Sequence, residues 1–175
     1  MTPPFVAVLG DEFGALAPSI RALHGATGLR RWEGRVTVSG ARGPVAWAMG
    51  AVGIAPRPMR EAPFAIEIEP DGEGEIWRRD FDGTHAASRV VVRGGLLHER
   101  VGFVTFALSA APRGRGLDLA SSGFWLAGLR LPGGYVPRGR VALGEDARGR
   151  YLFDVAALAP SGQVALRYEG WLMPA

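Results

Sequence analysis

The stretch from Gly74 to Gly102, GEIWRRDFDGTHAASRVVVRGGLLHERVG, decides the fold class. Its segments are rich in β-branched, aromatic and alternating apolar residues, which are typical of strands. Asp82-Gly83 and Gly94-Gly95 separate these segments and are tight-turn signals. The stretch therefore predicts three consecutive antiparallel strands joined by hairpins.

The same pattern continues on both sides of this stretch, from Phe64 to Leu172. Short alternating segments recur there between turn signals, which predicts roughly ten strands with hairpin-length connections. A meander of that many strands does not stay flat, because strand twist coils it into a barrel or splits it into a sandwich. We expect a strongly curved antiparallel barrel or half-barrel, lipocalin- or calycin-like in shape.

The first third of the chain has helical features. Apolar residues recur there at helical spacing, at Phe13, Leu16, Ile20 and Leu23. Pro18 suits the first turn of a short helix, and residues 29–40 predict a strand. Residues 44–54 predict an apolar helix that serves as a plug or a lid. Helices followed by strands indicate an α+β fold, and we expect residues 1–175 to form a single domain.

The composition excludes several kinds of chemistry. The chain has 175 residues, a formal charge of +3, no cysteine, and arginine as its only strongly basic residue. Without lysine or cysteine there is no Schiff-base lysine, thiolate nucleophile or disulfide. The scattered arginines argue against nucleic-acid binding. No apolar run approaches the roughly 20 residues of a membrane span, and no signal peptide is recognised, so we expect a cytoplasmic protein.

Arg79 is the most unusual placement in the sequence. Side chains two residues apart share one face of a strand, so Arg79 faces the same way as Trp77 and Phe81. If that face is the barrel interior, Arg79 is positioned to bind a carboxylate or phosphate on a ligand. The alternatives are an internal salt bridge with Glu99 or Asp154, or a cation–π contact with Trp77.

Three other polar residues have both a functional and a structural interpretation. Glu99 alternates with apolar neighbours and is either a general base or a partner of Arg79 or Arg100. Asp154 has the same two interpretations. His24 precedes Gly25, where a helix-end cap is favoured over a catalytic role. The three histidines form no paired motif, so we predict neither a metal site nor a cofactor.

Four short stretches in this order carry a family resemblance: residues 23–25; Trp77 to Phe81 with Ser88; residues 95–100; and residues 153–155 with 168–172. Together they resemble a bacterial family of domains of unknown function, found alone or fused behind saccharopine-dehydrogenase-like or other Rossmann modules. The resemblance implies a Rossmann-type enzyme as partner, and it assigns no catalytic residue.

Three hypotheses follow. The first is that the barrel binds a small apolar or amphipathic acid, with Arg79, Trp77, Phe81, Glu99 and Tyr168 as ligand-binding residues. The second is an acid/base enzyme or accessory domain that works with a dehydrogenase-type partner and uses Glu99 or His24. The third is an interaction module that docks through exposed apolar surface.

Overall fold

The computed structural model describes residues 2–40, 56–132 and 136–175. The helix predicted over residues 44–54 lies outside the described residues. None of the helices within the described ranges is long and apolar enough to cross a membrane.

Three short helical segments open the chain. They are α1 (Pro4–Leu9), the 3₁₀ helix η1 (Gly10–Ala15) and α2 (Pro18–Gly25). Proline lies in the first turn of both α1 and α2. There its fixed φ suits the helix and its missing N–H is not needed. The apolar run from Phe5 to Leu9 is therefore helical.

Eleven strands follow in the described part of the chain. They are β1 (Arg30–Gly40), β2 (Met59–Asp71), β3 (Gly74–Phe81), β4 (Thr84–Arg93), β5 (Leu96–Val101), β6 (Val104–Arg113), β7 (Gly116–Leu126), β8 (Leu129–Arg130), β9 (Arg138–Glu145), β10 (Tyr151–Leu158) and β11 (Val164–Pro174). The two-residue strand β8 is not predicted by the sequence, because a segment that short has no periodicity.

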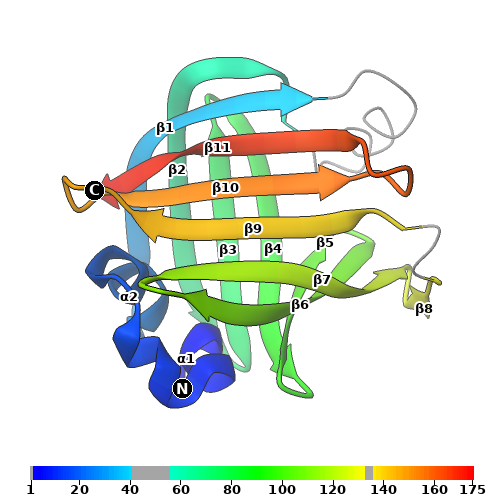
Figure 1. Ribbon diagram of the computed structural model, residues 1–175, viewed down its shortest axis with the longest axis horizontal. Helices are drawn as coiled ribbons and strands as arrows, with labels where there is room; N and C mark the ends of the chain where they lie inside the picture. The colour runs from blue at the N-terminus through cyan, green and yellow to red at the C-terminus, as the bar shows by residue number, and fades with distance from the viewer. Residues whose placement is uncertain (1, 41–55, 133–135) are drawn as a thin grey trace.

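Ten of these strands close into an antiparallel barrel, and β8 is appended to β7. Each of the ten pairs with its predecessor and its successor, and β1 completes the ring by pairing with β11. The strands lie in two crossing layers, with β1, β11, β10, β9 and β7 in front of β2, β3 and β4 (Figure 1). The predicted α+β fold with a curved antiparallel meander is thus confirmed.

The seam between β1 and β11 depends on two glycines. A Cβ atom on Gly34 would lie 1.9 Å from the carbonyl oxygen of Trp171, and one on Gly170 would lie 2.0 Å from that of Arg35. Such distances are far below van der Waals contact, so any side chain at either position would force the two strands apart. Gly34 and Gly170 therefore permit the close approach that closes the ring.

The helices lie at one end of the barrel (Figure 1). The backbone N–H of Ala17 donates to the carbonyl oxygen of Arg115 at 2.8 Å, and that of Ser19 donates to Oε2 of Glu145 at 2.7 Å. These bonds tie α2 to the β6–β7 turn and to the end of β9. Buried Phe5 of α1 and Leu23 of α2 extend the core from the barrel into the helices. The hydrophobic core therefore occupies the barrel interior and this end of it.

Candidate functional site

The inward face of β3 carries the predicted site. Trp77 and Phe81 are buried, and Arg79 between them has a side chain only 12% exposed. The prediction that all three side chains point into a rolled sheet is confirmed. Alternation along β3 thus brings a guanidinium into an interior that is otherwise largely apolar.

Arg79 pairs with Glu99 of β5. Its Nη2 donates to Oε1 of Glu99 at 2.8 Å, and its Nη1 donates to Oγ of Ser88 at 2.9 Å. Ser88 in turn donates to the same Glu99 oxygen at 2.7 Å. Burial alone would lower the pKa of Arg79, but the charge of Glu99 and its hydrogen bond outweigh burial and raise the pKa. The three side chains form a closed, charge-neutral cluster.

Arg79 also lies over the ring of Trp77, with its Cζ atom 5.2 Å from the ring centroid. Two of the structural alternatives for Arg79, the Glu99 salt bridge and the cation–π contact, are therefore both present. The third is wrong: Asp154 lies on the outer face of β10, where both of its carboxylate oxygens accept hydrogen bonds from Arg167. A register in which Phe153 faces inward forces its neighbour Asp154 to face outward.

Two cavities meet at the Arg79–Glu99 pair. Measured as space open to the centre of a water-sized sphere, their volumes are about 90 and 110 Å³. A single water needs about 10–15 Å³ on that measure, so each cavity has room for several waters or for part of a small molecule. We call them the inner compartment, which Phe5 and Leu23 of the helices line, and the outer compartment, which Phe81 and Phe106 line.

Most of the residues around both compartments are apolar. Six residues line both of them: Arg79, Glu99, Leu108, Val141, Val155 and Tyr168. Of the predicted ligand-binding residues, Arg79, Glu99 and Tyr168 face both compartments, Trp77 faces the inner one and Phe81 the outer one. The structure therefore brings all five together around one interior space.

Two tyrosines add hydroxyl groups to this interior. Burial raises the pKa of Tyr168, and the charge of Arg79 opposes that effect. Burial also raises the pKa of Tyr151 far above its usual range. Both phenols therefore keep their protons at neutral pH and are available as hydrogen-bond donors. The described residues offer the Tyr168 hydroxyl no hydrogen-bond partner.

His24 lies at the inner end of the inner compartment. It is 1% exposed, and its ring stacks on Phe5 with centroids 4.1 Å apart. Its Nε2 lies 2.9 Å from the Tyr151 hydroxyl oxygen, whereas its Nδ1 is buried with no hydrogen-bond partner among the described residues. Burial first, then the charges of Arg30 and Arg79, lower its pKa to about 3. His24 lies in the last turn of α2, but it does not cap the helix end as expected, because Nε2 contacts Tyr151 and Nδ1 contacts no helix carbonyl.

The His24 tautomer determines what Tyr151 offers to the cavity. Buried N–H groups without a partner are rarer in proteins than buried acceptors without one. This favours the tautomer in which Nε2 carries the proton and donates to Tyr151. The Tyr151 O–H is then free to donate into the inner compartment.

A second buried ion pair lies near the helices. Arg30 of β1 binds Glu75 of β3, and the two side chains are 5% and 2% exposed. Arg30 also donates to the carbonyl oxygen of Gly28 at 2.8 Å, and the indole N–H of Trp77 donates to Glu75 at 3.0 Å. Neither charged residue lines the two compartments. This pair joins the α2–β1 connection to β3.

The sequence analysis did not identify Tyr151, Arg30 or Glu75. Alternation contains the signal for the inward direction of all three, since Glu75 shares a strand face with Trp77, Tyr151 with Phe153 and Arg30 with Trp32. Alternation does not show that Arg30 pairs with Glu75, which lies 45 residues away. Within the described ranges, no three His, Asp or Glu side chains cluster in a way that would hold a metal ion.

The comparisons place the chain in a family. The profile of the family described as "Domain of unknown function (DUF4166)" matches residues 16–172. The chain belongs to this family. A comparison with curated proteins finds no match. The expected resemblance to a family of domains of unknown function is confirmed. The fusion to Rossmann modules and the bacterial origin stay predictions.

Proposed function

We propose that this DUF4166 barrel binds a small amphipathic molecule in its interior. The apolar body of the ligand would lie in the two compartments, and its polar end would contact Arg79, Glu99 and Tyr168. The observation that carries the proposal is the neutral Arg79–Glu99–Ser88 cluster at the junction of two largely apolar cavities. Binding pockets commonly combine an apolar lining with a few such convergent polar groups.

The polar end of the ligand is neutral when bound. Glu99 already neutralises the Arg79 guanidinium, so a carboxylate added at this pair would lie close to Glu99 and be repelled by it. A neutral group meets donors from Tyr168, Tyr151 and Arg79, and an acceptor in Glu99. An acidic ligand therefore enters in its protonated form, and an alcohol of the same chain length fits equally well.

The low pKa of His24 favours ligand binding over acid/base catalysis as the function. A catalytic base is most effective when its pKa lies near the working pH. The pKa of His24 is about 3, so the ring is a weak base at neutral pH. Glu99 accepts two hydrogen bonds that hold it in the cluster. We propose that His24 and Glu99 recognise the ligand.

We also propose that the domain binds this ligand in the cytoplasm, alone or beside a dehydrogenase-type partner.

The test compares 1-octanol with octanoic acid by quenching of tryptophan fluorescence, since Trp77 lines the inner compartment. We expect octanol to bind with an affinity that does not change with pH. Octanoic acid should bind only at pH values where it is protonated. Arg79→Ala should remove the binding of both and leave a folded barrel. Tight binding of octanoate at high pH, or unchanged binding by Arg79→Ala, would contradict the proposal.

A further inference from the structure

Arginines gather on the outer face of the barrel next to the β5–β6 hairpin. Arg89 and Arg93 lie on β4, Arg100 on β5 and Arg130 on β8, and we call these four the basic face. Arg89 and Arg100 are directly opposite each other in the β4–β5 register. Like charges in opposed positions destabilise a sheet, so this arrangement is not explained by the stability of the fold.

The basic face has more positive charge than the nearby carboxylates balance. Asp71 pairs with Arg89. The described residues provide no carboxylate within salt-bridge distance of Arg93, Arg100 or Arg130. His98 lies between the arginines, and burial and the charge of Arg93 lower its pKa, so it is neutral. A surplus of three positive charges is left, which attracts an anionic surface.

Exposed apolar side chains lie beside the basic face, at the turns. Phe103 is 73% exposed, Leu129 is 72% exposed and Leu126 is 45% exposed, and we call these three the apolar tip. The β5–β6 and β7–β8 turns that carry them are joined by a hydrogen bond of 2.8 Å from the N–H of Ala127 to the carbonyl oxygen of Phe103. The apolar tip is therefore one continuous feature built from two neighbouring turns.

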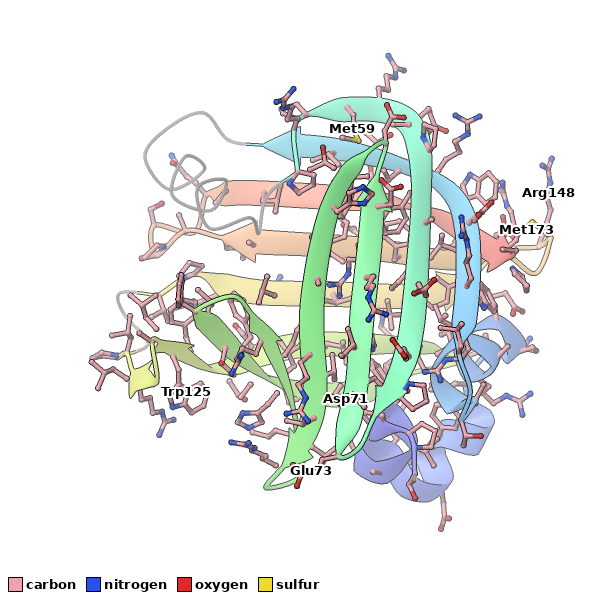
Figure 2. The ribbon with its side chains drawn as sticks, turned by 180° about the vertical axis from the view of Figure 1, so that it is seen from behind. Met59, Asp71, Glu73, Trp125, Arg148 and Met173 are labelled. Atoms are coloured by element: carbon pink, nitrogen blue, oxygen red, sulfur yellow. The ribbon has the colours of Figure 1, made fainter. Side chains whose placement is uncertain are left out.

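Trp125 lies among the charged side chains of the basic face and is next in sequence to Leu126 of the apolar tip. Its ring lies 5.6 Å from the guanidinium of Arg130 and 5.4 Å from the ring of His98. Trp125 lies on the side of the molecule away from the helices (Figure 2). Tryptophan at the boundary between apolar and charged surface is typical of proteins that bind at a membrane interface.

We infer that this end of the barrel docks on a membrane surface that contains anionic lipids. The apolar tip would enter the region between headgroups and acyl chains, and the basic face would contact the headgroups. Combined apolar insertion and basic attraction is the arrangement that gives interfacial binding. A nucleic acid would use the arginines and Trp125, but it offers no apolar medium for two leucines and a phenylalanine at the turn tips.

The docking end is also the end at which the outer compartment lies. Val101 and Phe106 flank the β5–β6 turn and line that compartment. A docked barrel would therefore hold the outer compartment next to the lipid, which is a source of amphipathic molecules. The membrane inference does not need this link, because it rests on the outer surface alone.

The experiment measures co-flotation of the full chain with vesicles of phosphatidylcholine, with and without phosphatidylserine. We expect binding that requires phosphatidylserine and weakens as salt is added. Phe103→Ser with Leu129→Ser should weaken binding roughly tenfold or more, since each side chain loses its insertion into the membrane. Arg93→Gln with Arg100→Gln should weaken it about fivefold for each arginine removed.

The matched controls lie at the other end of the barrel. Leu29 is 66% exposed in the connection before β1, and Arg148 is exposed in the β9–β10 turn. Leu29→Ser and Arg148→Gln should leave binding unchanged, and thermal melting should show that all variants fold. The inference is overturned if the wild type does not bind phosphatidylserine vesicles, or if the controls weaken binding as much. It is also overturned if single-stranded DNA binds and the vesicles do not.

Discussion

The barrel contains two inward arginine–glutamate pairs that differ in how fully the protein encloses them. Arg30 and Glu75 are almost completely buried, and Arg30 also binds the Gly28 carbonyl oxygen. Arg79 and Glu99 are 12% and 20% exposed and face two cavities. Glu75 of the first pair and Arg79 of the second lie on the same face of β3. The difference indicates that a buried ion pair is a candidate binding site when it faces a cavity, whereas a fully enclosed pair is part of the framework.

The largest expected effect comes from breaking the fully enclosed pair. Glu75→Ala leaves the Arg30 guanidinium buried without a counterion and removes the acceptor of the Trp77 indole. We expect the free energy of unfolding to fall by about 4 kcal/mol, measured by urea denaturation. Because Glu75 does not line the cavities, octanol should still bind to the fraction that stays folded. Loss of octanol binding at full stability would reverse the assignment of the two pairs.

Breaking the open pair should cost less. In Arg79→Ala, the carboxylate of Glu99 keeps its contact with Ser88 and faces a cavity that water can fill. We expect unfolding to become easier by about 2 kcal/mol, with complete loss of octanol binding.

A triple variant separates charge from packing at the open pair. Arg79→Met with Ser88→Ala and Glu99→Met replaces the whole cluster by apolar groups, so no charge is left unpaired. Its stability should return to within about 1 kcal/mol of the wild type without restoring binding. If the triple variant is less stable than Arg79→Ala alone, the cluster belongs to the framework after all.

His24, at the helix end of the interior, makes the stability of the fold depend on pH. Its pKa is about 3 in the folded protein and about 6.5 when unfolded, so the unfolded chain binds the proton more readily between these values. Stability therefore falls as the pH drops below 6.5. The expected loss is roughly 1.5 kcal/mol between pH 6.5 and pH 5.

His24→Phe removes the titrating group and keeps a ring that stacks on Phe5. The stability difference between this variant and the wild type, followed by thermal melting, should change across that pH window by the same amount. A constant difference would show that His24 is not buried in its neutral form.

The smallest effect is expected at the surface. Asp154 pairs with Arg167 on the outer face of β10 and β11, where both side chains are well exposed. Asp154→Ala should lower the melting temperature by less than about 2 °C, since an exposed ion pair contributes little. A larger loss would mean that this outer pair resembles the buried ones more than its exposure indicates.

The sequence predicts the barrel and part of its interior for one physical reason. Along a strand, every second residue shares a face, so one inward aromatic residue at Trp77 fixes the direction of Arg79 and Phe81. The same rule places Glu99 inward between Leu97 and Val101. The rule applies only where the direction of one residue on the strand is already known. On β10 that residue is Phe153, and its inward position shows that Asp154 faces outward.

What the sequence does not predict are contacts between elements that are distant along the chain. His24 and Tyr151 are 127 residues apart, and only the packing of α2 against the closed barrel brings them together. The division of the interior into two compartments likewise depends on the strand register around the ring. Periodicity within one strand contains no information on either.

The pairing of β1 with β11 has a consequence during protein synthesis. The ring cannot close until its last strand has left the ribosome, so β1 keeps an unpaired edge while the intervening strands emerge. An unpaired strand edge is a template for pairing with another chain. The time between the emergence of β1 and that of β11 is therefore when a nascent chain is most exposed to misassembly, and a chaperone would protect it most during that interval.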